Sequence, residues 1–376
     1  MPVGILILLF LGMNTVCWIQ SKRYKLNLTK TLKKPKFTVI VPAMNEEKMI
    51  RDVVQDFIGQ TYKNFEVLIM ANNCTDYTAE IARNFSRGDD RIRVFEYDTE
   101  EVGKAPALNK ALKNSTGNVI VAHDADVRVD FDFLEKLSEY YQDESIVAVQ
   151  PQYRIENENS NLLTMLQQIE FIMFSTIFNK GKAVLGETAL AGGVNFSIRK
   201  DILEKIGSWR NHLTEDYLLV DTLLKNGYKV TYADNLVARF QAVLSWDALM
   251  KQRSRWIRGH LEITAKTFIR KPTTLFDTLF KISPIYNALI FMLFCLFYAY
   301  IFFIHTEVTY FYFPNWMWIC GIILHQIILI DVCRQQKYWK GIVLSPIFLI
   351  YSLHWMLVLF RIPFVNSWQA TKVQRW

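Results

Sequence analysis

The sequence predicts an α/β domain with a mostly parallel sheet, accompanied by transmembrane and interfacial helices. Two observations predict this fold class. Between residues 37 and 150, continuous β-branched runs alternate with amphipathic helical segments, which is typical of a parallel sheet covered on both faces. Uncharged apolar runs also occur near both ends of the chain. The composition agrees, because 51% of the 376 residues are hydrophobic and the mean hydropathy is +0.10.

The strands and helices of the soluble part follow one another in a regular order. Each strand is a short apolar run, and each helix has apolar residues at helical spacing. Ligands bind beyond the carboxyl ends of the strands in such sheets, so the segments 43–46, 72–76 and 124–126 should line one crevice. The expected strands are 37–43, 66–70, 92–96, 118–126 (which runs into an acidic turn) and 146–151, and the expected helices are 46–59, 77–87, 103–115 and 131–142.

The apolar runs predict a multi-pass protein of the plasma (inner) membrane. Residues 3–19 carry no charge and lack both a basic n-region and a small-residue cleavage site, so we expect an uncleaved anchor. Residues 20–36 contain seven Lys or Arg and no acid, which places this flank and the domain after it in the cytoplasm. The runs 284–304, 316–330 and 341–360 predict about three further spans. The alternative is that one of the four runs lies in the interface.

The sequence does not decide on which side of the membrane the C-terminus lies. Alternation of the spans places the C-terminus outside, whereas Arg361, Lys372 and Arg375 favour the inside.

The five cysteines show no C-x-x-C spacing, which argues against a zinc site and a disulfide framework. The expected parts are a transmembrane anchor (1–20), a cytoplasmic domain (37–240), amphipathic interface helices (241–283) and a C-terminal transmembrane region (284–376).

Asp124 and Asp126 follow a strand that should be buried. Two carboxylates one residue apart in a turn can converge on one hard cation, and Mg²⁺ prefers one or two carboxylates together with substrate phosphates. The alternative is a solvated acidic turn, and the placement at a strand end leaves both interpretations open.

Asp216 lies in the segment Thr214-Glu215-Asp216 at the start of a predicted helix. A carboxylate at this place can act as a general base that accepts the proton of a sugar hydroxyl. The alternative is an ordinary helix start, with Thr214 as N-cap and both acids favoured by the helix dipole.

The cluster Gln252-Arg253-Ser254-Arg255-Trp256 lies in a basic amphipathic segment. Arg255 and Gln252 can bind a diphosphate leaving group, because the donor fork of arginine matches phosphate oxygens. Trp256 offers an apolar face on which a pyranose can stack. These roles need the helix to fold back over the crevice. The alternative is an interfacial helix with Arg as anchor and Trp at headgroup level.

Two glycine-containing segments are weaker candidates. Gly103 precedes Lys104, which could approach a phosphate or could be a surface lysine after a turn. Gly192 and Gly193 suggest a close backbone approach to a ligand, or a plain turn. Asp76 is expected to cap the helix starting at Tyr77 instead of binding a ligand.

Together, these segments resemble the family 2 glycosyltransferases, in particular the membrane-embedded branch that includes cellulose, chitin and hyaluronan synthases. The resemblance runs from Phe37 to Gly259, and its elements occur in the order of the family. They are "VIVPAMNE", "NNCTD", "GKAPALN", "DAD", "AGGVNFSIR", "TED" and "QRSRW".

The resemblance implies a GT-A type, Rossmann-like nucleotide-sugar domain and an inverting transfer from a UDP-sugar with Mg²⁺ or Mn²⁺. It implies Asp216 as the catalytic base, with Glu215 beside it, and Asp126 with Asp124 on the metal. Arg255 and Trp256 would complete the catalytic site, and Gly192, Gly193 and Trp256 would bind the acceptor. The implied nucleotide-sugar-binding residues are Pro42, Ala43, Asn45, Glu46, Asn72, Lys104, Asp124, Gln252 and Arg255. Position 72 departs from the family, which often has Asp there; an Asn side chain can still pair with a uracil edge.

The expected partners are a UDP-sugar donor, a glycan or lipid-linked glycan acceptor and the lipid bilayer, with a partner subunit or homo-oligomer left open and no nucleic acid. The first hypothesis is elongation of a polysaccharide or oligosaccharide, such as poly-N-acetylglucosamine or a glucan. The alternatives are a non-processive transferase that adds one sugar to a lipid-linked or short glycan acceptor, and a catalytically inactive membrane subunit.

Overall fold

The computed structural model describes residues 12, 14–29, 31, 34–101, 103–184, 193–270 and 315–362. The chain divides into two compact units, each built from discontinuous segments. The sheet unit comprises residues 25–157 and 185–242, and the helical unit comprises residues 1–24, 158–184 and 243–376. Residues 158–184 thus group with the helical unit, although they fall within the range expected for the cytoplasmic domain.

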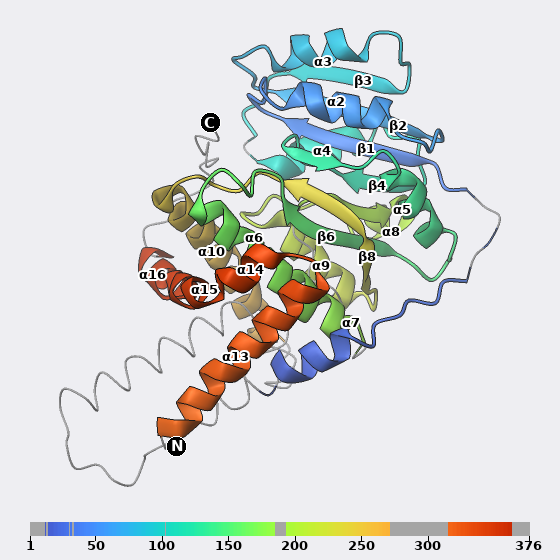
Figure 1. Ribbon diagram of the computed structural model, residues 1–376. Helices are drawn as coiled ribbons and strands as arrows, with labels where there is room; N and C mark the ends of the chain where they lie inside the picture. Colours follow the sequence, from blue (N-terminus) through green and yellow to red (C-terminus); the bar gives the residue numbers. More distant parts are fainter. Residues whose placement is uncertain are drawn as a thin grey trace. The chain divides into compact units, whose positions relative to one another are not determined.

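The sheet unit is built on one eight-stranded sheet (Figure 1). Its strands are β1 (Phe37–Ala43), β2 (Phe65–Asn72), β3 (Ile92–Tyr97), β4 (Val119–Ala122), β5 (Val127–Val129), β6 (Ala148–Ile155), β7 (Phe196–Arg199) and β8 (Val230–Phe240). They lie in the order β3-β2-β1-β4-β7-β6-β8-β5. The half formed by β3, β2, β1 and β4 is parallel, as expected. In the other half only β6 and β8 are parallel, while β7 and β5 run antiparallel to their neighbours.

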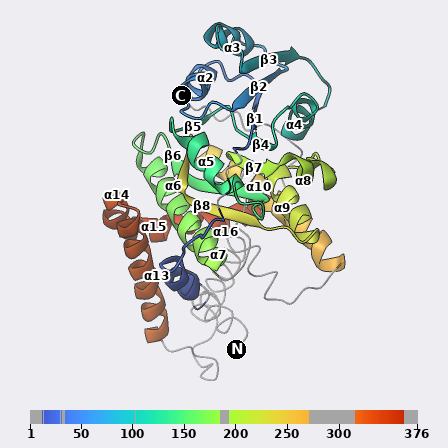
Figure 2. The ribbon, with the colours of Figure 1, turned by 90° about the vertical axis from the view of Figure 1, so that its right-hand side faces the viewer.

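Helices cover both faces of the parallel half. They are α2 (Ile50–Ile58), α3 (Thr78–Ser86), α4 (Lys104–Leu112) and α5 (Phe133–Tyr141), followed later in the unit by α8 (Lys200–Lys205) and α9 (Glu215–Lys225). Figure 2 shows α2 and α4 on opposite sides of β1 and β2. The expectation of a helix from residue 46 was too early, because residues 46–49 form a turn and α2 begins at Ile50.

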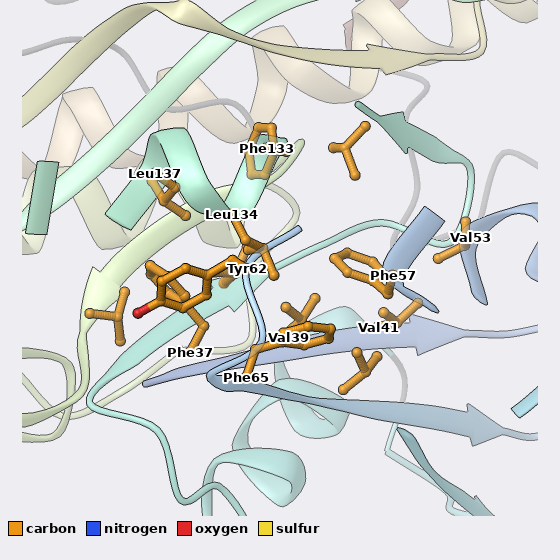
Figure 3. Close-up of a cluster of buried hydrophobic side chains, with 14 of the residues drawn as sticks. Phe37, Val39, Val41, Val53, Phe57, Tyr62, Phe65, Phe133, Leu134 and Leu137 are labelled. Atoms are coloured by element: carbon orange, nitrogen blue, oxygen red, sulfur yellow. The ribbon is translucent and has the colours of Figure 1, made fainter. Parts of the chain in front are cut away.

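The main core of the sheet unit lies between one face of the sheet, α2 and α5 (Figure 3). Alternate residues of β1 point into it, with Phe37, Val39 and Val41 against Phe57 of α2 and Leu134 of α5. The intervening residues are also buried, because α4 packs on the other face. Burial on both faces explains why these strands read as continuous apolar runs in the sequence.

The helical unit contains α6 (Leu162–Met173), the π-helix η1 (Phe174–Gly181), α7 (Lys182–Val184), α10 (Trp246–Arg270), α13 (Asn315–Gln335), α14 (Trp339–Val343), α15 (Ser345–Ser352) and α16 (His354–Arg361). Apolar residues of α6, α13 and α15 form its core. The run 341–360 is divided among three short helices, and Pro346, which has no amide hydrogen to donate, lies in the first turn of α15.

Within the residues that the structure describes, no helix combines the length and the apolar composition that a bilayer span requires. The predicted run 284–304 and most of the run 3–19 lie outside the described residues.

Candidate functional site

Register in the sheet brings the predicted polar segments to one edge. Ala43 at the end of β1 pairs with Ala71, and Asn72 ends β2. The chain leaves β4 after Ala122, which pairs with Ile40. Because β7 is antiparallel and begins opposite Ala122, the residues just before it enter at the same edge. The residues that meet this edge are Pro42, Ala43, Asn45, Glu46, Asn72, Asp124, Asp126 and Gly193.

The loops after β1 and β2 are fastened to each other. Asn45 adopts a left-handed backbone with φ 58°, and its side-chain oxygen accepts a hydrogen bond from the backbone amide of Thr75 at 2.7 Å. The amide of Glu46 donates to the hydroxyl of Thr78 at 2.7 Å. Asp76 accepts from the amide of Thr78, the first residue of α3, at 3.0 Å. The helix begins one residue later than predicted, so Tyr77 occupies the N-cap position without a side-chain capping bond and Asp76 lies one residue before the cap. The side chain of Asn45 therefore holds a loop in place, a role that its predicted binding function did not include.

The two adjacent asparagines at the end of β2, Asn72 and Asn73, differ in their hydrogen bonds. Asn73, with φ 51°, donates to the carbonyl of Thr99 and accepts from the amide of Thr99, both at 2.8 Å. Asn73 thus joins the ends of β2 and β3. Asn72 is buried, and no described residue hydrogen-bonds its side-chain amide. The amide of Asn72 is therefore the one left for a ligand.

The acidic turn is braced on both sides by neighbouring residues, His123 before it and Arg128 after it. The ring of His123 is fully buried and its Nε2 donates to the carbonyl of Val127 at 3.1 Å. Burial lowers the pKa of His123 to about 4, so the ring is neutral. Arg128 makes a bidentate pair with Asp56 of α2, with both distances 2.7 Å. The turn between these braces presents Asp124 and Asp126, both partly exposed.

Lys104 brings four predicted motifs together. Its ammonium pairs with the carboxylate of Asp124, lies 4.0 Å from Glu215 and donates to the carbonyl of Gly193 at 2.9 Å. Burial alone would lower the pKa of Lys104, but the carboxylates of Asp124, Glu215 and Asp216 outweigh it and raise the pKa. Lys104 is therefore a protonated, largely buried cation within an acidic cluster, which excludes the surface-lysine interpretation.

Both glycines near this cluster lie close to the ends of neighbouring side chains. Gly103 has φ 124°, and a Cβ there would lie 2.5 Å from the side-chain oxygen of Asn211. At Gly193 a Cβ would lie 3.3 Å from a carboxylate oxygen of Asp216 and 3.4 Å from the Lys104 nitrogen. Gly192 lies outside the described residues.

The start of α9 places its acids beside Lys104. Thr214 occupies the N-cap position, but its side chain makes no capping bond and instead contacts His212, at 3.3 Å. Asp216 accepts a hydrogen bond from the amide of Tyr217 at 2.8 Å and stays partly exposed, whereas Glu215 is buried. Of the two acids, Asp216 is the one with an accessible carboxylate.

Comparison with known proteins agrees with this arrangement. A family model described as "Glycosyl transferase family 2" matches residues 38–207. Residues 38–207 are a family 2 glycosyltransferase domain. The probable glycosyltransferase YdaM of Bacillus subtilis (strain 168) is 31% identical over 243 residues, covering 62% of this chain and 57% of YdaM. The chain thus spans little more than half the length of that relative.

A second relative covers more of the chain. The poly-beta-1,6-N-acetyl-D-glucosamine synthase of Staphylococcus aureus (strain COL) is 26% identical over 310 residues, which are 77% of this chain and 73% of the synthase. Among solved structures, the mannosyltransferase PcManGT from Pyrobaculum calidifontis, in complex with GDP-Man and Mn²⁺, superposes with a TM-score of 0.61. It is 18% identical, and the match covers 94% of this chain and 97% of that one. The likeness shows the fold, a GT-A-like α/β Rossmann-type fold.

Two carboxylates of the glycosyltransferase domain suit a divalent cation. Among the described residues no group of three or more His, Cys, Asp or Glu gathers as a metal site. Asp124 and Asp126 would hold Mg²⁺ or Mn²⁺ together with substrate oxygens, because these cations take one or two carboxylates beside the phosphates of a substrate. Bound there, the cation would neutralise negative charge on a diphosphate. The carboxylate of Asp124 already contacts one cation in the structure, the Lys104 ammonium.

The Gln252–Trp256 cluster lies outside the matched glycosyltransferase domain, on α10 of the helical unit. Gln252, Arg255 and Trp256 are partly exposed, whereas Arg253 is fully buried. Folding of this helix over the crevice stays a prediction.

Proposed function

We propose that this chain is an inverting glycosyltransferase that moves a sugar from a UDP-sugar to a glycan hydroxyl and elongates a polysaccharide of the poly-N-acetylglucosamine type. The observation that carries the proposal is the cluster of Lys104, Asp124, Gly193, Glu215 and Asp216 at the carboxyl edge of the sheet. It combines a cation, a possible metal ligand (Asp124) and an accessible carboxylate (Asp216). The similarity to a poly-N-acetylglucosamine synthase supports the choice of sugar.

In the proposed reaction Asp216 accepts the proton of the acceptor hydroxyl as its oxygen attacks the anomeric carbon of the donor. The bond from that carbon to the diphosphate breaks, and UDP leaves with the electron pair. Lys104 would balance part of the negative charge of the departing diphosphate. One in-line displacement inverts the anomeric configuration, so no enzyme nucleophile is needed.

The choice of UDP rests on Asn72. Its amide can donate and accept at once, which matches the edge of uracil, and no described residue hydrogen-bonds that amide. Competition between UDP and GDP for the binding site, measured by calorimetry with Mn²⁺ present, tests this assignment. Stronger binding of GDP would overturn it.

We also propose that the protein is a multi-pass protein of the plasma (inner) membrane with its glycosyltransferase domain in the cytoplasm. The apolar runs and the basic flank at residues 20–36 support this location. So does the helical unit, where α13 to α16 expose many large apolar side chains. These include Ile322, Ile323, Ile327, Trp339, Val343, Ile350, Leu357 and Phe360.

The deciding experiment measures UDP release from UDP-N-acetylglucosamine by the purified protein with Mn²⁺ and a short glycan acceptor. We expect Asp216→Asn to lower kcat by about 10²- to 10⁴-fold, because the general base is lost, while UDP binding stays near the parent value. Asp201→Asn, an exposed acid in the first turn of α8, is the control and should match the parent.

Product length separates the two modes of transfer. A ladder of products supports elongation, whereas a single addition would assign the alternative, non-processive reaction. An Asp216→Asn protein that transfers at the parent rate would remove Asp216 as the base. A parent protein that releases no UDP from any UDP-sugar would contradict the proposed function as a whole.

A further inference from the structure

The helical unit contains a buried ion pair next to residues assigned to donor and acceptor. Arg253 has no exposed side-chain surface, and its Nη2 donates to an oxygen of Glu170 on α6 at 2.8 Å. Desolvating two charges costs several kcal/mol per ion before their attraction is counted. Such a pair is therefore weak evidence for stability, and its presence calls for another explanation.

Glu170 gathers donors from two further helices. The hydroxyl of Tyr351 on α15 donates to it at 2.8 Å, and the indole of Trp355 on α16 donates at 2.9 Å. Burial alone would raise the pKa of Glu170, but Arg253 and the other donors outweigh burial and lower the pKa. The carboxylate is therefore ionised, and it ties α15 and α16 to the guanidinium on α10.

The guanidinium of Arg253 also contacts two neighbours, Gln252 and Trp256, to which the family resemblance assigns donor and acceptor binding. Its Nη1 donates to the side-chain oxygen of Gln252 at 3.0 Å. Its central carbon lies 4.2 Å from the ring centre of Trp256, within the range of a cation–π contact. The rings of Phe171 and Trp355 enclose it further, at 5.4 and 5.5 Å.

We propose that Arg253 is a positioning residue for sugar transfer, held by Glu170, which sets the orientation of the Gln252 amide and the Trp256 ring. This inference rests on the proposed function. With its oxygen occupied by Arg253, Gln252 presents its NH₂ group as a donor, the polarity that an anionic diphosphate requires. One face of Trp256 lies against the guanidinium, and Phe171 is 6.4 Å away in an edge-to-face arrangement, so a stacked sugar would have to take the opposite face of the indole.

Two single substitutions and their double variant separate positioning from stability. Arg253→Met leaves a buried carboxylate and Glu170→Gln leaves a buried cation, so each single variant should lower the Tm. The double variant contains neither charge, and Gln at position 170 can accept from the indole of Trp355 through its one oxygen and donate to the hydroxyl of Tyr351 through its NH₂ group. We expect the double variant to regain most of the parent Tm, because replacing both members of a buried pair is often neutral.

Activity should not return with stability. We expect kcat for UDP release by the double variant to stay about 10- to 100-fold below the parent, because Gln252 and Trp256 lose the group that orients them. Arg253→Lys should recover only part of the rate, since one ammonium cannot serve Glu170 and Gln252 as a fork does. Arg258→Met, which removes a surface pair with Glu262 on the same helix, is the matched control and should keep the parent kcat and Tm.

The outcomes distinguish this inference from the proposed function. A double variant with both parent Tm and parent kcat would overturn the inference, since the pair would then be merely structural. So would an Arg253→Met protein with unchanged kcat. Absence of UDP release from the parent protein itself would overturn the proposed function instead.

Discussion

At the scale of single residues, Lys104 is the side chain that connects the predicted motifs in space. Its sequence context, a lysine after a glycine at a helix start, is compatible with a surface position. The structure buries it against Asp124 and the carbonyl of Gly193. Three carboxylates around one ammonium keep it charged. A positive charge already held in this place can stabilise the negative charge on a donor diphosphate. No side chain then has to reorient during the reaction.

Replacing Lys104 should reduce sugar transfer while the protein stays folded. Lys104→Met should lower kcat/KM for the UDP-sugar by about 100-fold, the range seen when one preorganised charge partner is removed. Initial rates of UDP release measure the effect, and the melting temperature reports on folding. Lys113→Met, an exposed lysine just beyond the end of α4, is the control. Equal rates for Lys104→Met and parent would remove Lys104 from the site.

The acidic turn predicts a metal-dependent defect. Asp126→Asn should weaken the increase in UDP affinity that Mn²⁺ produces, because an amide oxygen is a poorer ligand for a hard cation than a carboxylate. Calorimetric titration of UDP with Mn²⁺ and with EDTA measures this difference. In EDTA the variant and the parent should bind UDP equally. A variant whose response to Mn²⁺ equals that of the parent would show that Asp126 is not a ligand.

At the scale of elements, the strands of the parallel half and β6 were predictable from the sequence, whereas β5, β7 and β8 were not. Strands buried on both faces give continuous apolar runs, which is why β1, β2 and β4 are visible in the sequence. β5 and β7 have three and four residues, too few for a pattern. β8 is long, but its pairing with β6 jumps from Ala233 to Val237, and this bulge interrupts its alternation.

The same contrast applies to the candidate site. The acids and Lys104 could be found because carboxylates and a lysine at strand ends and helix starts have an evident chemistry. The braces could not, since Asp56 and Arg128 are distant in sequence and nothing in either local pattern indicates the pair. Asn45 and Asn73 carry a weak signal, because asparagine tolerates the left-handed backbone that both adopt.

The ion pair of Arg128 and Asp56 should affect catalysis although neither side chain is assigned to the reaction itself. Arg128→Gln should reduce kcat by about 10-fold or more through displacement of the acidic turn. It should reduce the free energy of unfolding by about 1–3 kcal/mol, the range for hydrogen bonds to charged groups. Denaturant unfolding and UDP release measure the two effects. Lys136→Gln, which removes a surface pair with Asp132, should change neither, and parent kcat in Arg128→Gln would contradict the brace.

At the scale of the whole molecule, the helical unit is assembled from three distant segments. The indole of Trp18 donates to Asp331 of α13 at 2.7 Å, and Lys22 pairs with the same carboxylate at 2.8 Å. Gly181 packs against the backbone of Cys17, where a Cβ would not fit. Sequence patterns could not assign α6 and η1 to this unit, because their apolar residues would suit any core equally well. Their partners are set by contacts across more than a hundred residues.

The proposed membrane location predicts which exposed side chains touch lipid. Trp339 and Ile350 of the helical unit expose 67% and 69% of their surface, and Tyr77 and Phe131 of the sheet unit expose 68% and 65%. The four side chains are thus about equally exposed. They differ in their surroundings, because α13 to α16 expose many further apolar residues. A diazirine amino acid placed at each position in turn, followed by irradiation in native membranes, should give lipid adducts at 339 and 350 and none at 77 and 131. Adducts at all four positions, or at neither position of the helical unit, would show that these helices do not form a lipid-facing surface.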